Sequence, residues 1–270
     1  MGLYKAQFIS MIIMIALGIG MFVGFNMEWV SIEENTTSFF EKTGYADYRI
    51  LSERGFSEDD LKKIGNISGV TASARYLSTS ADVKEKGGDS VALTVTTDPN
   101  VSGFIVTEGE QYAADSKDGI WLSDKYAAAN GIKVGDTLTF VYKSIEFKGT
   151  VKGLAKSGEH MICVRDESQL MPDYNSYGFA YISPEMYKNA AGFEFYPQIN
   201  VRSDMEKKDF TEKVDAALGN TTMILTKDET ISYSQANGEA SEGKTMGSIL
   251  PVMFLLIAVL TMVTTMHRLT

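Results

Sequence analysis

The feature that most constrains this chain is a pair of uncharged apolar runs, one near each end. Residues 8–25 read FISMIIMIALGIGMFVGF, and residues 249–266 read ILPVMFLLIAVLTMVTTM. At a rise of 1.5 Å per residue, a helix of this length spans about 27 Å, which is close to the thickness of the hydrocarbon core of a bilayer. The pattern therefore predicts two transmembrane helices, with residues 28–248 forming one polar segment between them.

The orientation of this segment follows from the basic residues at the outer ends of the two runs. Lys5 precedes the first run and Arg268 follows the second, whereas the segment between them is acidic in a chain whose net charge is −10. The positive-inside preference places both termini in the cytoplasm and residues 28–248 outside it. Trp29 would then lie at the outer interface, where an indole ring is favourable.

A cleaved signal peptide is the alternative interpretation of the first run. Against it, the apolar core exceeds the usual length of about 7–15 residues, and no small-residue cleavage site follows. The next residues, NMEWVSIEENTTSFFEK, continue a helical pattern. We therefore interpret residues 1–44 as a transmembrane helix that extends into a stalk.

Small residues lie close together in this first run. Gly20 and Gly24 form a G-x-x-x-G pattern, with Gly18 beside it. Such spacing lets a second helix approach closely. Gly18, Gly20 and Gly24 are the residues that we predict to act in helix packing and coupling.

The polar segment alternates between strand-like and helix-like stretches, which predicts an α+β fold. Capped or amphipathic patterns predict helices that begin at Ser57, Ser123 and Ser183, and one over residues 205–218. Strands are predicted by alternation or by short apolar runs, at residues 45–51, 70–77, 91–97, 119–122, 137–142, 145–154, 177–182, 197–202 and 222–226.

Composition excludes several classes of function. The single cysteine, Cys163, excludes a disulfide framework and a cysteine-rich metal site. The acidic balance argues against nucleic acid, which needs a basic face. Glu159 and His160 lie near Cys163, but their spacing fits no standard zinc set. No pair of residues stands out as a catalytic acid and base, so we predict a non-catalytic protein without metal or cofactor.

One stretch, Gly238–Thr245, matches the phosphate-loop pattern G-x-x-x-x-G-K-T. A working phosphate loop follows a buried strand and opens a helix that packs on a parallel sheet. Here the stretch leads into the second apolar run and contains two glutamates that would repel phosphate. We interpret it as a flexible polar junction.

Five stretches carry a resemblance to a known family. Residues 7–27 and 46–70 resemble the N-terminal portion of the long FtsX-like ABC transporter permeases of Gram-positive bacteria. Residues 123–140 and 146–157 look like the middle of the MacB-type extracytoplasmic core domain, where a helix, a glycine and a Val-Gly-Asp turn lead into a β-rich subdomain. The terminal FLLIAVLTMVTTMHRLT is similar to the second span of that family.

The resemblance implies a divided outer domain between the two transmembrane helices. Its mixed α/β subdomain would comprise residues 45–98 and 177–226, and an inserted β-rich subdomain would comprise residues 99–176. Residues 227–248 would form the stalk or junction that leads to the second transmembrane helix, 249–266.

The resemblance also implies how such a protein works. It implies a homodimer or pseudo-dimer in the lipid of a bacterial plasma membrane, partnered by a separate cytoplasmic ATPase, that acts on a lipid, lipoprotein, peptide or envelope partner. Members of the family carry at least two further spans, so we expect more chain after Thr270. The alternative is a two-span receptor or scaffold that senses an extracellular ligand or regulates a cell-wall enzyme. An anchored enzyme is a third hypothesis, but it needs a catalytic pair.

Overall fold

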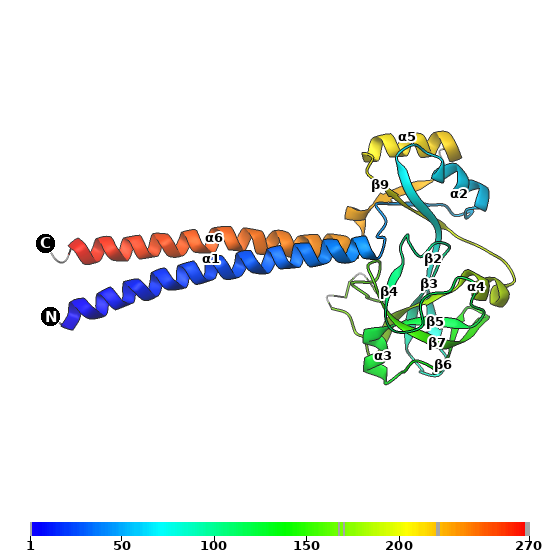
Figure 1. Cartoon of the computed structure of the whole chain (residues 1–270), viewed down its shortest axis with the longest axis horizontal. Coiled ribbons are helices and arrows are strands. Elements are labelled where there is room, and N and C mark those ends of the chain that lie inside the picture. The colour runs from blue at the N-terminus through cyan, green and yellow to red at the C-terminus, as the bar shows by residue number, and fades with distance from the viewer. Residues whose placement is uncertain (1, 167, 170, 220–221, 268–270) are drawn as a thin grey trace. The chain divides into compact units, whose positions relative to one another are not determined.

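The computed structural model describes residues 2–166, 168–169, 171–219 and 222–267, and it divides into two compact units (Figure 1). The first unit consists of the described residues up to Ser38 and from Gln235 onward, and we call it the helix pair. The second unit is Phe39–Ser234, which we call the domain.

Two long helices make up the helix pair, α1 (Gly2–Lys42) and α6 (Ile231–His267). Both are long and apolar enough to cross a membrane. Their most apolar stretches are almost entirely unburied, unlike the core helix of a soluble protein. Large apolar side chains are exposed along both helices, among them Phe8, Ile12, Leu17, Val252, Leu256 and Leu260.

The segment before the second apolar run differs from its prediction as a flexible polar junction. A short 3-10 turn, η1 (Lys227–Glu229), is followed by α6, which continues through three glycines and Pro251. A Cβ added at Gly243 would lie 2.8 Å from the Cβ of Trp29 on α1, and one added at Gly247 would lie 3.4 Å from the Cβ of Phe25. These glycines admit the neighbouring helix, so packing outweighs their low helix propensity.

The helical backbone also settles the phosphate-loop pattern. Gly238–Thr245 lies entirely inside α6, so its amides are not arranged as a loop that could surround a phosphate. The match to the pattern is therefore a coincidence of sequence.

The domain is α+β, as predicted, and its strands form a ten-stranded sheet. The helices are α2 (Glu58–Gly65), α3 (Asp124–Asn130), α4 (Pro184–Ala191) and α5 (Lys207–Leu218). The strands are β1 (Tyr48–Leu51), β2 (Val70–Val83), β3 (Ser90–Thr96), β4 (Phe104–Gly109), β5 (Gly119–Ser123), β6 (Thr137–Tyr142), β7 (Ile145–Ser157), β8 (Tyr177–Ile182), β9 (Gln198–Ser203) and β10 (Met223–Thr226).

Local signals placed most of these elements correctly. The Ser123 hydroxyl accepts a hydrogen bond from the amide of Tyr126 to begin α3, and Gly131 ends that helix with φ 67°. Two features were missed. Strand β4 was not predicted, because it is a partly exposed edge strand whose register shifts between Val106 and Glu108. Strand β2 extends six residues beyond its predicted end at Leu77.

One part of the sheet has the strand order β10-β1-β9-β2, with antiparallel neighbours throughout. The connections β1-α2-β2 and β9-α5-β10 give it the arrangement of a ferredoxin-like fold. Helices α2 and α5 lie against this part of the sheet (Figure 1). Ile64 of α2 and Phe210 and Val214 of α5 share a buried core with Ile50 and Ile199 of the sheet.

The other part of the sheet closes on itself. The pairings run β2-β3-β8-β5-β7-β6 and return to β2, where Val83 pairs with Phe140. We call these six strands the strand ring. Closure leaves no free edge among them, and their core includes Leu122, Phe140 and Phe147. The predicted division at 98/99 and 176/177 stays a prediction.

Candidate functional site

Inside the domain, the last turn of α1 lies close to the first turn of α6. The ring of Phe40 lies 5.4 Å from that of Tyr233, and the ring of Tyr45 lies 4.4 Å from that of Phe40. The hydroxyls of Tyr45 and Thr230 are 2.6 Å apart. We call these four residues the stalk base. Burial, and secondarily the nearby Glu159, raises the pKa of Tyr45 to about 12, so its hydroxyl stays protonated.

A buried ion pair lies next to the stalk base. The Nη2 of Arg49 donates to Oε2 of Glu159 at 2.7 Å, and the two side chains are only 7% and 8% exposed. The guanidinium carbon also lies 4.8 Å from the centroid of the Tyr45 ring. Burial, the largest single effect, opposes the charge on Arg49, but the charge and hydrogen bond of Glu159 together with Tyr45 outweigh it and raise the pKa of Arg49. The Arg49 guanidinium is therefore charged at neutral pH.

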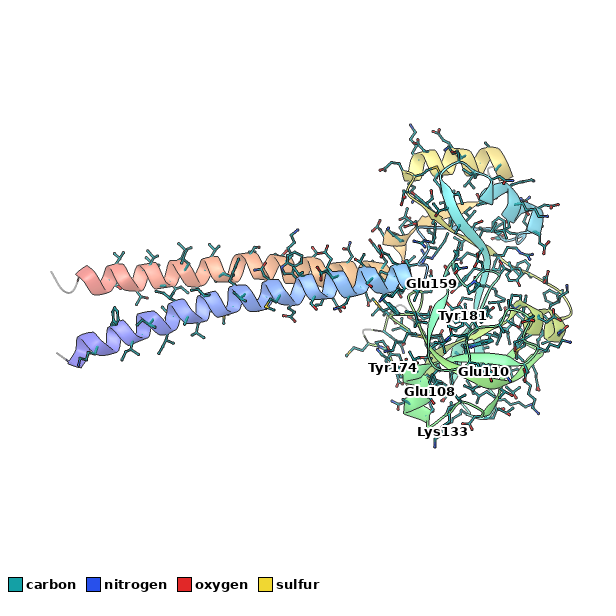
Figure 2. All side chains as sticks on the ribbon, in the orientation of Figure 1. Glu108, Glu110, Lys133, Glu159, Tyr174 and Tyr181 are labelled. Atoms are coloured by element: carbon teal, nitrogen blue, oxygen red, sulfur yellow. The ribbon has the colours of Figure 1, made fainter. Side chains whose placement is uncertain are left out.

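The second oxygen of Glu159 is also occupied. Its Oε1 accepts from the Ser102 hydroxyl at 2.8 Å and from the amide of Ala46 at 3.4 Å. The Ser102 hydroxyl in turn accepts from the side-chain amide of Asn200 on β9. Because the protein itself engages both oxygens, this carboxylate is a structural tie between distant segments. Glu159 is labelled among the side chains in Figure 2.

The chain just after α1 is held by a turn from the middle of the sequence. The amide of Ser102 donates to the carbonyl of Gly44 at 2.7 Å, and that of Gly103 donates to the carbonyl of Thr43 at 2.9 Å. Gly44 has φ 63°, and a Cβ there would lie 1.9 Å from the Asn100 carbonyl oxygen. Only glycine fits this position.

The chain before α6 is held by a second ion pair. Nζ of Lys227 lies 2.9 Å from Oδ1 of Asp47, and the amide of Lys227 donates to the carbonyl of Asp47 at 2.9 Å. The other Asp47 oxygen accepts from the amide of Ser203 at 3.1 Å. The side chains of this pair are 37% and 23% exposed, so it is weaker than the buried pair.

His160 and Cys163, which the sequence places near Glu159, are both packed into the domain. The Nε2 of His160 lies 3.0 Å from the Thr94 hydroxyl, and its ring stacks on Phe179 with centroids 5.0 Å apart. Burial lowers the pKa of His160 to about 4 and raises that of Cys163 to about 12. Within the part of the chain that the structure describes, no three His, Cys, Asp or Glu side chains are grouped to hold a metal ion.

The three glycines predicted for helix packing fall on different faces of α1. A Cβ added at Gly18 would lie 3.6 Å from the Cβ of Phe254 on α6. One added at Gly20 or Gly24 would meet nothing within 4 Å. Gly18 therefore faces the second helix, whereas the G-x-x-x-G pair points away from it. The coupling role of all three stays a prediction.

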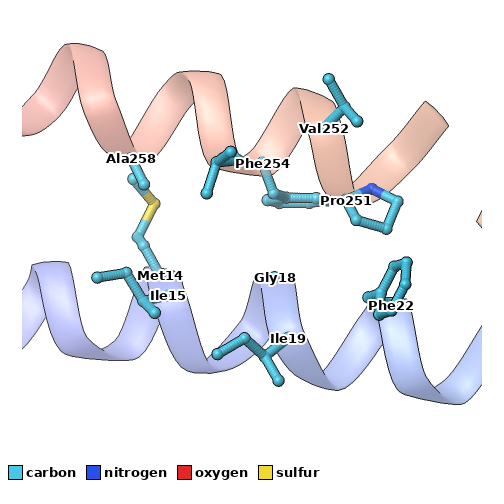
Figure 3. Close-up of a pocket in the computed structure, with 10 residues that line it drawn as sticks. Met14, Ile15, Gly18, Ile19, Phe22, Pro251, Val252, Phe254 and Ala258 are labelled. Atoms are coloured by element: carbon cyan, nitrogen blue, oxygen red, sulfur yellow. The ribbon is translucent and has the colours of Figure 1, made fainter. Parts of the chain in front are cut away.

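An apolar groove of about 310 Å³ lies between the two helices at this level (Figure 3). Phe22 of α1 and Pro251 of α6 face each other across it, and Gly18 lies beneath Phe254. The groove shows that the two helices are in contact without filling the space between them.

Sequence reasoning missed Arg49 and Glu159 as partners. Alternation in the predicted first strand put Tyr48 and Ile50 on one face, which leaves Arg49 on the other. That is the only local signal, because Glu159 lies 110 residues further along the chain. A lone arginine in an otherwise apolar strand indicates a buried partner, but it does not say which one.

No protein-family model matches the chain, and no curated protein has a matching sequence. Among solved structures, it is similar to the extracellular domain of the noncanonic ABC-type transporter YknZ from Gram-positive bacteria, with 11% identity and a TM-score of 0.46 over 66% of this chain and 98% of that one. The fold is similar to extracytoplasmic domains of ABC-type transporters. The periplasmic region of MacB from Actinobacillus actinomycetemcomitans has 14% identity and a TM-score of 0.43, over 76% of this chain and 97% of that one.

A domain of a putative permease from Porphyromonas gingivalis is similar at 12% identity and a TM-score of 0.38, over 61% of this chain and 78% of that domain. At these identities and scores the likeness describes the fold and carries no information about substrate or mechanism.

Proposed function

We propose that this protein is the membrane subunit of an FtsX- or MacB-like ABC transporter in a bacterial plasma membrane. In this proposal a separate cytoplasmic ATPase drives conformational change in the extracytoplasmic domain, which acts on a lipid, lipoprotein, peptide or envelope partner. The termini face the cytoplasm, as the positive-inside preference predicts from Lys5 and Arg268. Arg268 lies outside the residues that the structure describes.

The observation that carries the proposal is the length of the two helices. Helix α1 has 41 residues and α6 has 37. At 1.5 Å per residue they measure about 60 Å and 55 Å, roughly twice the hydrocarbon core of a bilayer. A simple anchor needs only about 20 residues. The extra turns continue into the domain without a break and end at the stalk base, so each helix can carry a displacement from the membrane into the domain.

A disulfide across the helix pair tests this function. A Cβ at Gly247 would lie 3.4 Å from the Cβ of Phe25, close to the separation in a disulfide. We call the pair Phe25→Cys with Gly247→Cys the stalk disulfide. The native Cys163 is buried with a raised pKa, so it should not compete for oxidation.

An ABC-type ATPase should co-purify with the tagged protein from native membranes. In the same membranes, the rate of forming the stalk disulfide should change several-fold when ATP is trapped in that ATPase. The two single-cysteine variants are the controls and should show no intramolecular product. If no ATPase co-purifies and the rate ignores ATP, the transporter proposal fails, and a receptor or scaffold becomes the better interpretation.

A further inference from the structure

We infer that Ser157–Cys163 is a strap that binds the ends of both long helices and passes their displacement into the strand ring. Its purpose rests on the proposed transport function, but its existence does not. Three sets of contacts carry the inference, one to each helix end and one to the ring.

The strap holds the end of α1 most tightly. Glu159 supplies the buried ion pair with Arg49 and accepts from the amide of Ala46. A Cβ added at Gly158 would lie 2.4 Å from the hydroxyl oxygen of Thr43 and 3.1 Å from the ring of Phe40. The strap backbone therefore lies directly against the last turn of α1, and the ion pair fixes the chain that follows.

The strap holds the start of α6 through one side chain. The hydroxyl of Ser232 donates to the carbonyl of Glu159 at 3.1 Å and accepts from the amide of Ile162 at 3.3 Å. Ser232 is 3% exposed, so water does not compete for these bonds. Removing the hydrogen bonds of a neutral hydroxyl destabilises a protein far less than removing one partner of a buried ion pair does. The α6 attachment is therefore the weaker of the two.

The other end of the strap belongs to the strand ring. Ser157 is the last residue of β7, and its hydroxyl lies 2.9 Å from that of Tyr181 on β8. His160 lies 3.0 Å from the hydroxyl of Thr94 on β3. A movement of the strap therefore reaches three strands of the ring. Because the two helix attachments differ in strength, α6 should be released first while α1 stays bound.

Hydrogen exchange of the full chain in detergent micelles tests the strap. Ser232→Ala should raise exchange about tenfold in residues 230–234 and 160–163 and leave residues 43–47 unchanged. Glu159→Gln should raise exchange about 100-fold in residues 43–47 and also in residues 230–234, although they lie far apart in sequence. Glu146→Gln, whose carboxylate pairs with Lys84 on the surface, is the matched control and should change neither.

Residues 211–218 of α5 report on general unfolding, because Val214 lies in the core that α5 shares with Ile50 and Ile199. Lys207 is left out, because its Nζ lies 2.8 Å from Oε2 of Glu229, just before α6. If Ser232→Ala raised exchange in residues 43–47 as much as in 230–234, the unequal attachment would be refuted. If Glu159→Gln left residues 230–234 unchanged, or loosened α5 equally, there would be no strap. Should Glu159→Gln fail to fold, Ser232→Ala still decides. Neither variant involves the ATPase, so the strap and the transport proposal can fail separately.

Discussion

The buried ion pair between Arg49 and Glu159 should be the most sensitive point of the domain. Glu159→Gln keeps the shape and one acceptor oxygen but leaves the Arg49 charge, whose side chain is 7% exposed, without a counter-ion. Breaking a buried pair in this way costs about 3–5 kcal/mol. For a domain of this size, that lowers the melting temperature by roughly 6–20 °C.

The matched partner variant is Arg49→Met, which leaves Glu159 as the unpaired buried charge. Each single variant should lose about 3–5 kcal/mol, whereas the double variant should lose far less than their sum, because it removes both charges together. The surface variant Glu146→Gln, whose side chain is 52% exposed, should change the free energy of unfolding by no more than about 0.5 kcal/mol.

Unfolding can be followed through Trp121, which is 1% exposed in the core next to the strand ring. The only other tryptophan, Trp29, lies in the helix pair and is replaced by Phe in all variants. The reasoning is refuted if Glu159→Gln costs no more than Glu146→Gln, or if the two single effects simply add in the double variant.

Three further predictions concern a titrating group and two sets of glycines. Burial lowers the pKa of His160 from 6.5 to about 4, so as the pH falls the unfolded chain takes up this proton before the folded chain does. The free energy of unfolding should therefore be at its full value above pH 6.5 and fall by up to about 3 kcal/mol as the pH drops toward 4. His160→Gln should remove that part of the decline when unfolding is measured by urea titration. Gly44→Ala should lower the free energy of unfolding by more than about 3 kcal/mol, because its Cβ would collide with backbone atoms. Gly131 has a similar φ but open space around it, so Gly131→Ala should lower the free energy of unfolding by only about 1 kcal/mol in the same assay. Gly18→Leu should slow formation of the stalk disulfide at least tenfold by pushing α6 away, and Gly20→Leu should not change the rate; equal rates would contradict the packing described.

The strap explains why a polar network persists in the middle of the domain. A core of apolar side chains would hold the helix ends as firmly, since buried ion pairs are often no more stabilising than well-packed apolar residues. The network instead specifies which segments meet, because a misplaced Glu159 would leave Arg49 unpaired. We expect such specificity to matter where two helices must end at defined positions.

Much of the architecture could be predicted locally. The two apolar runs, the Ser123 cap and the Gly131 stop each depend on a few consecutive residues, because transfer to lipid and helix capping are properties of short stretches. The same holds for the alternating strands, whose period places one face toward a core.

The elements that depend on tertiary contacts, like the candidate site itself, could not be predicted in this way. Strand β4 has no clean alternation because it lies at an edge, and β2 continues past Leu77 because β3 and β6 pair with its extension. Residues before Ile249 looked flexible because glycine disfavours an isolated helix, and only the close approach of α1 at Gly243 and Gly247 makes the helix continuous.

The sequence by itself determined that two long apolar helices lie before and after an acidic α+β domain. Only the tertiary structure decided that Arg49 meets Glu159, that Ser232 binds the same segment, and that six strands close into a ring. The reason is physical: local propensities act over a few residues, whereas these contacts join segments up to 110 residues apart, and their energy exists only once the chain has folded.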